Sequence, residues 1–313
     1  MTSPTTPAHR PTPLKASTPE DVLAAIPVVL GFEPSDSVVM LTFGGGETFH
    51  ARVDLPPPTA LREAVAQLLD PATAHGVTRV VFVFYADDTP TVRALTRKLR
   101  RSFCRAGIDV VEVLRAHAGR WFAPGRPGAT GAGVPYDISG HRFRAQAVVD
   151  GIVVHGSREE LEAMLRSRPD EVAVVAQAVR RAVPSPPGEI ADLVDVRLDS
   201  GRFTPLELAR VLLGLLDGHG RDGALAAISR EVASSHVRLW TDAVQRAPDD
   251  LVAAPAAVLS LAAWLAGNGA LAWCAVDRCQ AVDPGNTLAR LVADALTRAV
   301  PPSAWAPAEA EAG

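Results

Sequence analysis

The sequence predicts an α/β domain, a mixed sheet flanked by helices, followed by an all-helical C-terminal domain with one tetratricopeptide-like hairpin. In the first half of the chain, β-rich apolar runs alternate with amphipathic stretches, whereas every periodic stretch after residue 141 has helical spacing. A proline-rich segment, Val183 to Gly188, separates the two halves. At 313 residues the chain is long enough for two domains.

The α/β domain begins with a predicted helix and a predicted β-hairpin. Thr18-Pro19-Glu20-Asp21 is typical of a helix start, because threonine caps, proline fits the first turn and the acids face the positive end of the helix dipole. Gly31 is expected to end this helix as a left-handed cap. The apolar run Ser37 to Phe43 predicts a central strand, and Gly44-Gly45-Gly46 predicts the turn into a half-buried strand, Thr48 to Leu55.

The rest of the α/β domain alternates between helices and strands, which predicts the mixed sheet. We expect helices over 59–69 and 91–106, and strands over 77–85 and 108–114. The next segment, Gly119 to His141, contains many glycines and three prolines. It is expected to be a long loop, either a lid or a disordered segment.

Composition also predicts where the domains begin and end. The expected parts are a disordered lead-in at 1–17, the α/β domain at 18–183, a linker at 184–188, the helical domain at 189–300 and a disordered tail at 301–313. Within the helical domain, Thr204-Pro205-Leu206-Glu207 predicts a capping box at the start of a helix. Two apolar helices joined at Gly267-Asn268-Gly269 resemble a single tetratricopeptide-type hairpin.

Residue usage argues against several classes of function. Lys15 and Lys98 are the only lysines, so there is no GK[ST] phosphate loop, and we expect no Schiff-base lysine. The three cysteines lack the spacing of a metal hook, and we expect no metal and no cofactor. No apolar run reaches the roughly 18 residues of a membrane span, and no secretory signal is evident. We therefore expect a soluble, cytoplasmic protein without a membrane partner. The net charge of −4 argues against nucleic acid as a partner, and the oligomeric state stays open.

Several short motifs carry a resemblance to a known family. They are Pro27 to Val39 (P-x-L-L-G-F-x-P-x-x-S-V-V in the family), Arg52 to Pro56 (R-x-D-L-P), Gly119-Arg120-Trp121, Trp264 to Ala272 (W-x-x-G-x-G-A-x-A) and Asp283-Pro284. Through these motifs the chain resembles an uncharacterised actinobacterial family that is known only as a domain of unknown function. Relatives often carry cysteines after G-R-W, whereas Phe122 to Pro135 has none, so a metal or redox role of that loop is not expected. The resemblance implies no activity, substrate or catalytic residue.

Two groups of residues are candidates for a site. His50, Arg52 and Asp54 alternate along the second expected strand and share one of its faces. His50 and Asp54 are candidates for catalytic residues, and Arg52 is a candidate for binding a ligand. Alternatively, the three side chains form a solvent-facing row with ordinary cross-strand pairing and no functional role. Arg120 and Trp121 are further ligand-binding candidates, because an arginine can bind an anion and a tryptophan ring can stack on a ligand. Alternatively, Trp121 only anchors the loop to the core.

The helix expected over 91–106 carries a basic face. Its cations are Arg93, Arg97, Lys98, Arg100, Arg101 and Arg105, opposite an apolar face. Such a face can contact phosphates or an acidic partner, or it can simply be the solvated side of an amphipathic helix. No aromatic residues are interleaved for base stacking.

Two hypotheses about function remain. The absence of a recognisable catalytic set favours a cytoplasmic, non-enzymatic binding or protein-interaction protein that engages a protein partner through its helical domain. The alternative is an enzyme acting on a small anionic, phosphorylated metabolite, with a site around His50, Arg52, Asp54 and Arg120. The second hypothesis requires that these residues share one cleft.

Overall fold

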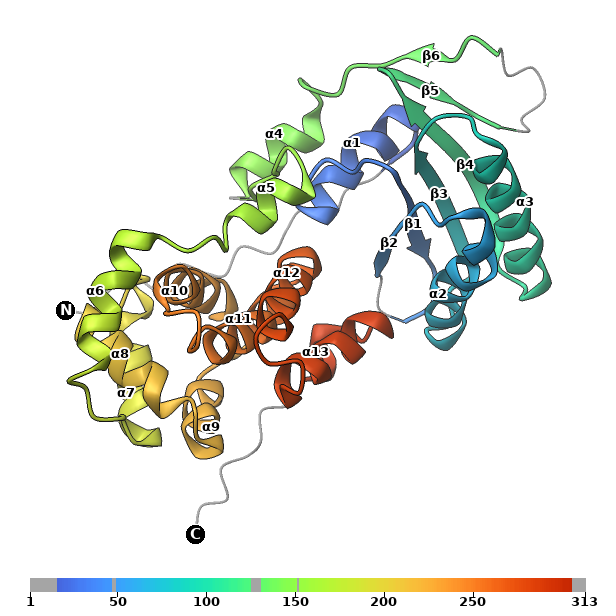
Figure 1. Cartoon of the computed structure of the whole chain (residues 1–313). Coiled ribbons are helices and arrows are strands. Elements are labelled where there is room, and N and C mark those ends of the chain that lie inside the picture. Colours follow the sequence, from blue (N-terminus) through green and yellow to red (C-terminus); the bar gives the residue numbers. More distant parts are fainter. Residues whose placement is uncertain (1–15, 47–48, 125–130, 151, 306–313) are drawn as a thin grey trace, which may run out of the picture. The chain divides into compact units, whose positions relative to one another are not determined.

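The computed structural model describes residues 16–46, 49–124, 131–150 and 152–305 (Figure 1). The chain divides into two compact units, Met1–Arg158 with Thr297–Ala299 and Glu159–Leu296 with Val300–Gly313. Most of the predicted lead-in, and the predicted tail after residue 305, lie outside the described residues. Among the described helices, none combines the length and the apolar character needed to cross a bilayer.

The described part of the first unit contains a six-stranded mixed sheet, which confirms the predicted fold class for this half of the chain. Its strand order is β2-β1-β3-β4-β5-β6. Only β3 and β4 pair in parallel, and the other neighbours are antiparallel. The strands are β1 (Ser37–Phe43), β2 (His50–Asp54), β3 (Arg79–Tyr85), β4 (Asp109–His117), β5 (Arg120–Phe122) and β6 (Val134–Pro135).

Helices cover both faces of this sheet (Figure 1). The side chains of β1 alternate between two cores: Val38 and Met40 pack with α2 (Leu61–Ala74) and α3 (Pro90–Arg105). Val39 and Leu41 pack with α1 (Pro19–Leu30) on the opposite face. This double burial explains why β1 is apolar on both sides. The short helices η1 (Pro58–Ala60) and α4 (Arg142–Val149) complete the unit.

The ends of α1 follow the sequence prediction. The Thr18 hydroxyl accepts a hydrogen bond from the Asp21 N–H, and the Asp21 carboxylate accepts one from the Thr18 N–H, which forms a capping box. Pro27 lies inside the helix, which continues to Leu30. Gly31 ends it with φ of 81°, a conformation that glycine adopts without a steric penalty.

The segment predicted as a long loop, 119–141, contains two short strands in its described parts. β5 pairs with the end of β4, and β6 pairs with β5, so this segment extends the sheet at one edge. Residues 125–130 lie outside the described residues. The prediction missed these strands because they are only three and two residues long and are rich in neither alternation nor β-branched residues.

The second unit is all-helical in its described residues, as predicted. The helices are α5 (Arg158–Ala163), α6 (Pro169–Val179), α7 (Pro187–Leu198), α8 (Pro205–Gly214), α9 (Gly218–Ala226), α10 (Ala233–Arg246), α11 (Ala253–Leu265), α12 (Gly269–Gln280), α13 (Thr287–Thr297) and η2 (Pro302–Ala304). α11 and α12 pack closely as the expected hairpin, with Gly267 at positive φ between them. The first residues of the predicted tail are ordered, since Trp305 packs edge-on against Trp264.

The two units meet in sequence at Arg158 and Glu159, earlier than the linker expected at 184–188. α6 packs against α8 and α10, so the residues before the proline-rich segment belong with the helices. Ser185 in that segment is 3% exposed, and its N–H donates to the Arg210 carbonyl. Proline breaks a helix, but its extended backbone can still pack inside a domain, so a proline-rich segment can lie within a compact unit.

We expect Gly45→Ala to destabilise the first unit and Gly46→Ala to have little effect. Gly45 has φ of 99°, and a Cβ there would lie 2.7 Å from the His75 carbonyl oxygen, whereas nothing lies within 4 Å at Gly46. The expected loss for Gly45→Ala is about 1–3 kcal/mol. Urea denaturation of both variants measures it, and equal midpoints for the two would contradict the geometry of this turn.

Candidate functional site

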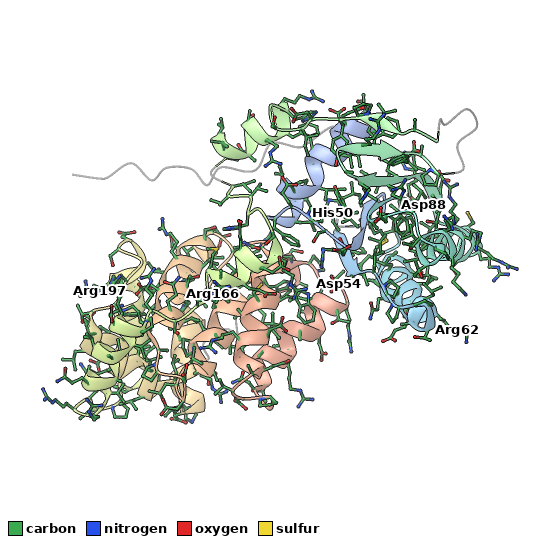
Figure 2. The ribbon with its side chains drawn as sticks, turned by 45° about the horizontal axis from the view of Figure 1, so that its top comes forward. His50, Asp54, Arg62, Asp88, Arg166 and Arg197 are labelled. Atoms are coloured by element: carbon green, nitrogen blue, oxygen red, sulfur yellow. The ribbon has the colours of Figure 1, made fainter. Side chains whose placement is uncertain are left out.

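The candidate residues of β2 lie on the face of the sheet that α1 covers. The register pairs His50 with Leu41, Arg52 with Val39 and Asp54 with Ser37. Val39 and Leu41 belong to the core beneath α1. The side chains of His50, Arg52 and Asp54 are therefore only partly exposed to bulk solvent as a row. The Arg52 side chain is 13% exposed and that of Asp54 71% exposed, so exposure increases along the row toward Asp54. Figure 2 labels His50 and Asp54, the first and last residues of β2.

Arg52 links the edge strand to the segment that follows α1. Its Nη2 lies 2.7 Å from Asp54 Oδ1 and donates to the Ser35 carbonyl at 3.2 Å. Its guanidinium also lies over the Phe32 ring, 5.5 Å from the centroid. These contacts join two of the segments that carry the family resemblance. They give Arg52 a structural role, in addition to any ligand contact.

Unpartnered polar atoms gather at the same end of the sheet, and the sequence did not indicate them. Ser37 pairs with both Asp54 and Tyr85 in neighbouring strands, and its buried Oγ has no hydrogen-bond partner among the described residues. The same holds for Tyr85 Oη and Arg52 Nε. Burial, with Tyr136 and Glu33 nearby, raises the pKa of Tyr85 well above its usual value, so its hydroxyl stays neutral.

His50 is a poor candidate for a general base. Its Nδ1 faces the Thr42 N–H at 3.4 Å, and burial lowers its pKa to about 4. A base with such a pKa accepts protons weakly at neutral pH, where catalytic bases are most efficient with a pKa near 7. Asp54 is exposed, and its carboxylate pairs with the Arg52 guanidinium within the chain.

Arg120 and Trp121 hold β5 in place. Arg120 Nε donates to the Ala132 carbonyl at 2.7 Å, and its Nη2 donates to the Gly133 carbonyl at 3.1 Å. Trp121 Nε1 donates to Glu20 Oε1 at 2.7 Å, which fastens the strand to α1. Three strands separate β2 from β5, a distance of roughly 19 Å at the usual strand spacing. The structure therefore does not bring Arg120 together with the β2 row.

A pocket of about 700 Å³ lies in the helical unit, where α6, α7, α8 and α10 approach one another. We call it the arginine pocket. Its lining residues are Asp170, Glu171, Val174, Arg197, Ser200, Arg202, Phe203, Thr204, Pro205 and Arg246. Five of these ten residues are charged and three of them are arginines, while most of the surface that the pocket exposes is apolar.

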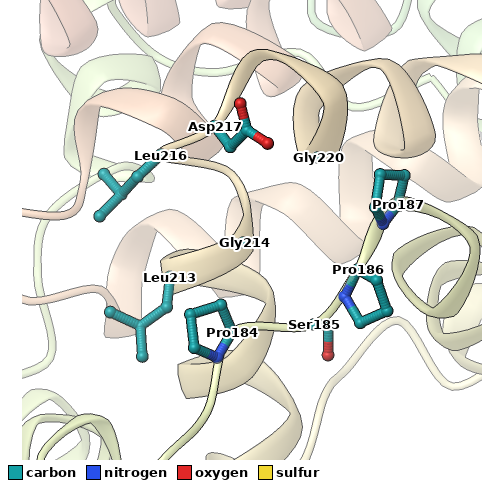
Figure 3. A pocket seen from close by; sticks show the side chains of 9 residues that line it. All are labelled: Pro184, Ser185, Pro186, Pro187, Leu213, Gly214, Leu216, Asp217 and Gly220. Carbon is teal, nitrogen blue, oxygen red and sulfur yellow. The ribbon is translucent and has the colours of Figure 1, made fainter.

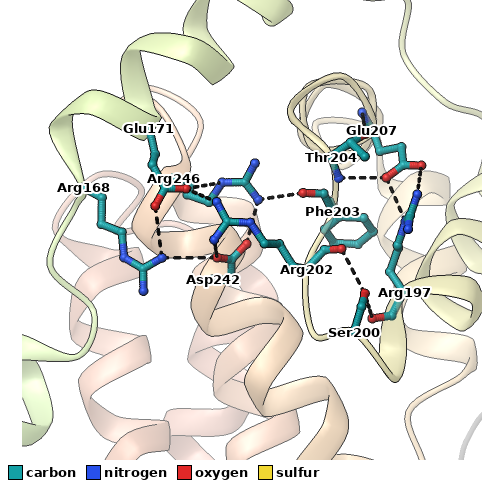
Figure 4. Close-up of polar contacts among 10 residues, drawn as sticks. All are labelled: Arg168, Glu171, Arg197, Ser200, Arg202, Phe203, Thr204, Glu207, Asp242 and Arg246. Atoms are coloured by element: carbon teal, nitrogen blue, oxygen red, sulfur yellow. Dashed lines mark hydrogen bonds and ion pairs between the residues drawn. The ribbon is translucent and has the colours of Figure 1, made fainter.

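Arg246, at the end of α10, is the buried centre of the arginine pocket (Figure 4). Its Nη1 donates to Asp242 Oδ2 at 2.7 Å and to the Phe203 carbonyl at 2.8 Å. Its Nε lies 3.2 Å from Glu171 Oε2 without the geometry of a hydrogen bond. A buried guanidinium is tolerated only with such partners, so these contacts tie α6, α10 and the segment before α8 together.

Three guanidinium groups share two carboxylates in this cluster. Arg202 and Arg168 each contact both Glu171 and Asp242, which also hold Arg246. Partial burial alone would raise the pKa of Glu171, but the hydrogen bonds and charges of Arg202 and Arg168 outweigh it and lower the pKa. The cluster itself thus carries one excess positive charge, which exposed Asp170 balances at the rim.

A second ion pair frames the other side of the pocket. Arg197 donates twice to the Glu207 carboxylate, at 3.0 and 2.7 Å, and this pairing is the main reason that the pKa of Glu207 is lowered. Thr204 and Glu207 also form the capping box of α8 that the sequence predicted. Val174 lines the pocket and is 50% exposed. Leu206, which follows the lining residue Pro205 in sequence, is 54% exposed. The pocket therefore combines charge with apolar rim contacts.

A second pocket, of about 680 Å³, lies between the proline-rich segment and the turn from α8 to α9 (Figure 3). Asp217 is the only charged residue among its lining residues. Gly214 packs against the Ser185 carbonyl so closely that a Cβ would lie 2.5 Å away. This pocket reflects backbone packing and offers few groups to orient a ligand.

Sequence reasoning missed the arginine pocket. Arg168, Arg202 and Arg246 come from different elements, and no motif links them. The capping box at Thr204 was the one local signal of this region. Among the described residues, no group of three or more His, Cys, Asp and Glu side chains is arranged to hold a metal ion.

Comparisons with known proteins give a family match that covers most of the chain. A family model described as a domain of unknown function (DUF4192) matches residues 19–303. The comparison with curated proteins found no match. The comparison with solved structures found none either. The family is therefore assigned from the sequence match alone, and no relative supplies an activity.

We expect stability to fall as pH drops from about 6.5 to 4, partly because of His50. Its pKa is about 4 in the folded chain against an ordinary value of 6.5, so the unfolded chain takes up a proton first. This favours unfolding by up to about 1.4 kcal/mol per pH unit in that window. Urea midpoints at several pH values should fall less steeply in His50→Gln, and an unchanged slope would contradict the assignment.

We also expect Arg52→Gln to destabilise the first unit by about 1–2 kcal/mol, because a mostly buried side chain with three contacts is lost. Asp54→Asn should cost less than about 0.5 kcal/mol, since that carboxylate is largely exposed. Chemical denaturation of both variants distinguishes the two roles. Equal losses would mean that the ion pair, and not the packing of Arg52, matters.

Proposed function

The chain belongs to this family of unknown function, and we propose that it is a cytoplasmic, non-catalytic binding protein that engages a partner protein through its helical unit. The arginine pocket is the observation that supports this proposal most directly. It is open to solvent, measures about 700 Å³, and has three arginines among its ten lining residues. Arginine-rich surfaces with apolar neighbours are typical of protein-binding sites.

The pocket separates arginines with a structural role from arginines that a partner can reach. Arg246 is 2% exposed in its side chain and is committed to internal partners. Arg168 and Arg202 are 45% and 49% exposed, so they can exchange an internal carboxylate for one from a partner. Val174, which lines the same pocket as Arg202, offers an exposed apolar contact. This arrangement favours a segment that carries a carboxylate next to an apolar side chain.

The alternative function, an enzyme acting on a small phosphorylated metabolite, receives less support. It needs His50, Asp54, Arg52 and Arg120 in one cleft. Three strands lie between β2 and β5, and His50 has a pKa of about 4. Binding without catalysis is therefore the function that the geometry favours.

A photo-crosslinking amino acid at position 174 tests the proposal. In cells it should capture a specific protein, which is then purified and titrated against the wild-type chain and variants by calorimetry. Arg202→Ala should weaken binding about tenfold, because one charge-assisted contact is lost. Arg290→Ala, which changes an exposed arginine on α13 outside the pocket, is the matched control and should bind as the wild type does.

Two outcomes would contradict the proposal. One is equal affinity of the Arg202→Ala and wild-type chains for the captured protein. The other is a phosphorylated metabolite that raises the melting temperature of the wild type and loses this effect in both Arg52→Ala and Arg120→Ala. The second outcome would favour the enzyme.

A further inference from the structure

Helix α3 has a charge composition unlike the rest of the chain. Its sixteen residues include six cations and no acid. The chain as a whole has a formal net charge of −4, so with these six cations set aside the remainder carries −10. One helix of the first unit therefore concentrates positive charge within a molecule that is otherwise acidic.

The cations lie on the outer face of the helix. Val92, Leu95, Leu99 and Phe103 are buried against the sheet and α2, so α3 cannot rotate to hide its other side. Arg97, Lys98, Arg101 and Arg105 are exposed. From Arg93 to Arg105 the basic face measures about 18 Å along the helix axis.

The chain neutralises little of this charge. Arg93 pairs with Asp88 at 2.9 Å, and Arg100 donates to the Pro124 carbonyl. Within the described part of the chain, the other four cations make no hydrogen bond or ion pair through their side chains. These four residues are Arg97, Lys98, Arg101 and Arg105.

A face that served only to contact water would not need this arrangement. Residues four apart are neighbours on a helix, and like charges there destabilise it. The pairs Arg93/Arg97, Arg97/Arg101 and Arg101/Arg105 all have this spacing. Alternating acids and bases would keep the face polar and would stabilise the helix. The uniform charge therefore points to an anionic partner.

We propose that the exposed face of α3 binds an acidic segment of another protein. A peptide in extended conformation needs only about six residues to match 18 Å. A long nucleic acid would extend past the helix onto a chain that is otherwise net negative, and the face offers no aromatic side chain for base stacking. The apolar face of α3 is buried in its own unit, so the helix cannot insert into a bilayer. This surface is independent of the arginine pocket.

The test uses the full chain and a fluorescein-labelled peptide of about ten glutamates, whose length exceeds the basic face. Fluorescence anisotropy should show binding that weakens as salt rises from about 0.05 to 0.2 M. Arg101→Glu should weaken it about tenfold. Arg290→Glu, with the same change in net charge on α13, should stay within about twofold of the wild type.

The thermal stability of the Arg101→Glu variant distinguishes a role of Arg101 in binding from a role in the fold. Arg101→Glu replaces two repulsive spacings, to Arg97 and Arg105, with attractive ones, so its melting temperature should be unchanged or higher while binding falls. The proposal is overturned if the peptide does not bind at low salt, or if Arg290→Glu weakens binding as much as Arg101→Glu. It is also overturned if a labelled DNA duplex or an anionic vesicle binds more tightly than the peptide does.

Discussion

The burial of β1 on both faces is the constraint from which the first unit is built. Six of its seven residues are buried, and Val38 and Val39 serve opposite cores. β2 and β3 pair with its two edges, so its position decides where both neighbours lie. The same register decides that Arg52 shares a face with Val39. A side chain that looks surface-like in sequence thereby becomes part of the contact between the sheet and the segment after α1.

In the helical unit, the corresponding constraint is the burial of a charge. Arg246 cannot stay buried without Asp242, Glu171 and the Phe203 carbonyl, so three separate segments must meet at it. Arg168 and Arg202 then join the same carboxylates from the solvent side. The arginine pocket is therefore a consequence of how the buried guanidinium of Arg246 obtains its hydrogen-bond and charge partners. The side chains of Arg168 and Arg202 remain about half exposed.

Local features were predictable because neighbouring residues decide them. The capping boxes at Thr18 and Thr204 and the left-handed conformation of Gly31 depend on groups within four residues of one another. The proline-rich segment is an ambiguous local signal. It does interrupt the helices, but glycines such as Gly214 allow its backbone to pack inside the second unit. Composition cannot distinguish a packed break from a linker, because the difference lies in residues elsewhere in the chain.

The sequence by itself determined the fold class, the membership of a family and the basic face of α3, since alternation, helical spacing and charge are properties of consecutive residues. Only the tertiary structure decided that Arg120 and Arg52 lie on strands four positions apart, and that Arg168, Arg202 and Arg246 meet around two carboxylates. The reason is physical. Strand order and helix packing follow from which apolar surfaces bury one another, and that choice is made between segments far apart in sequence.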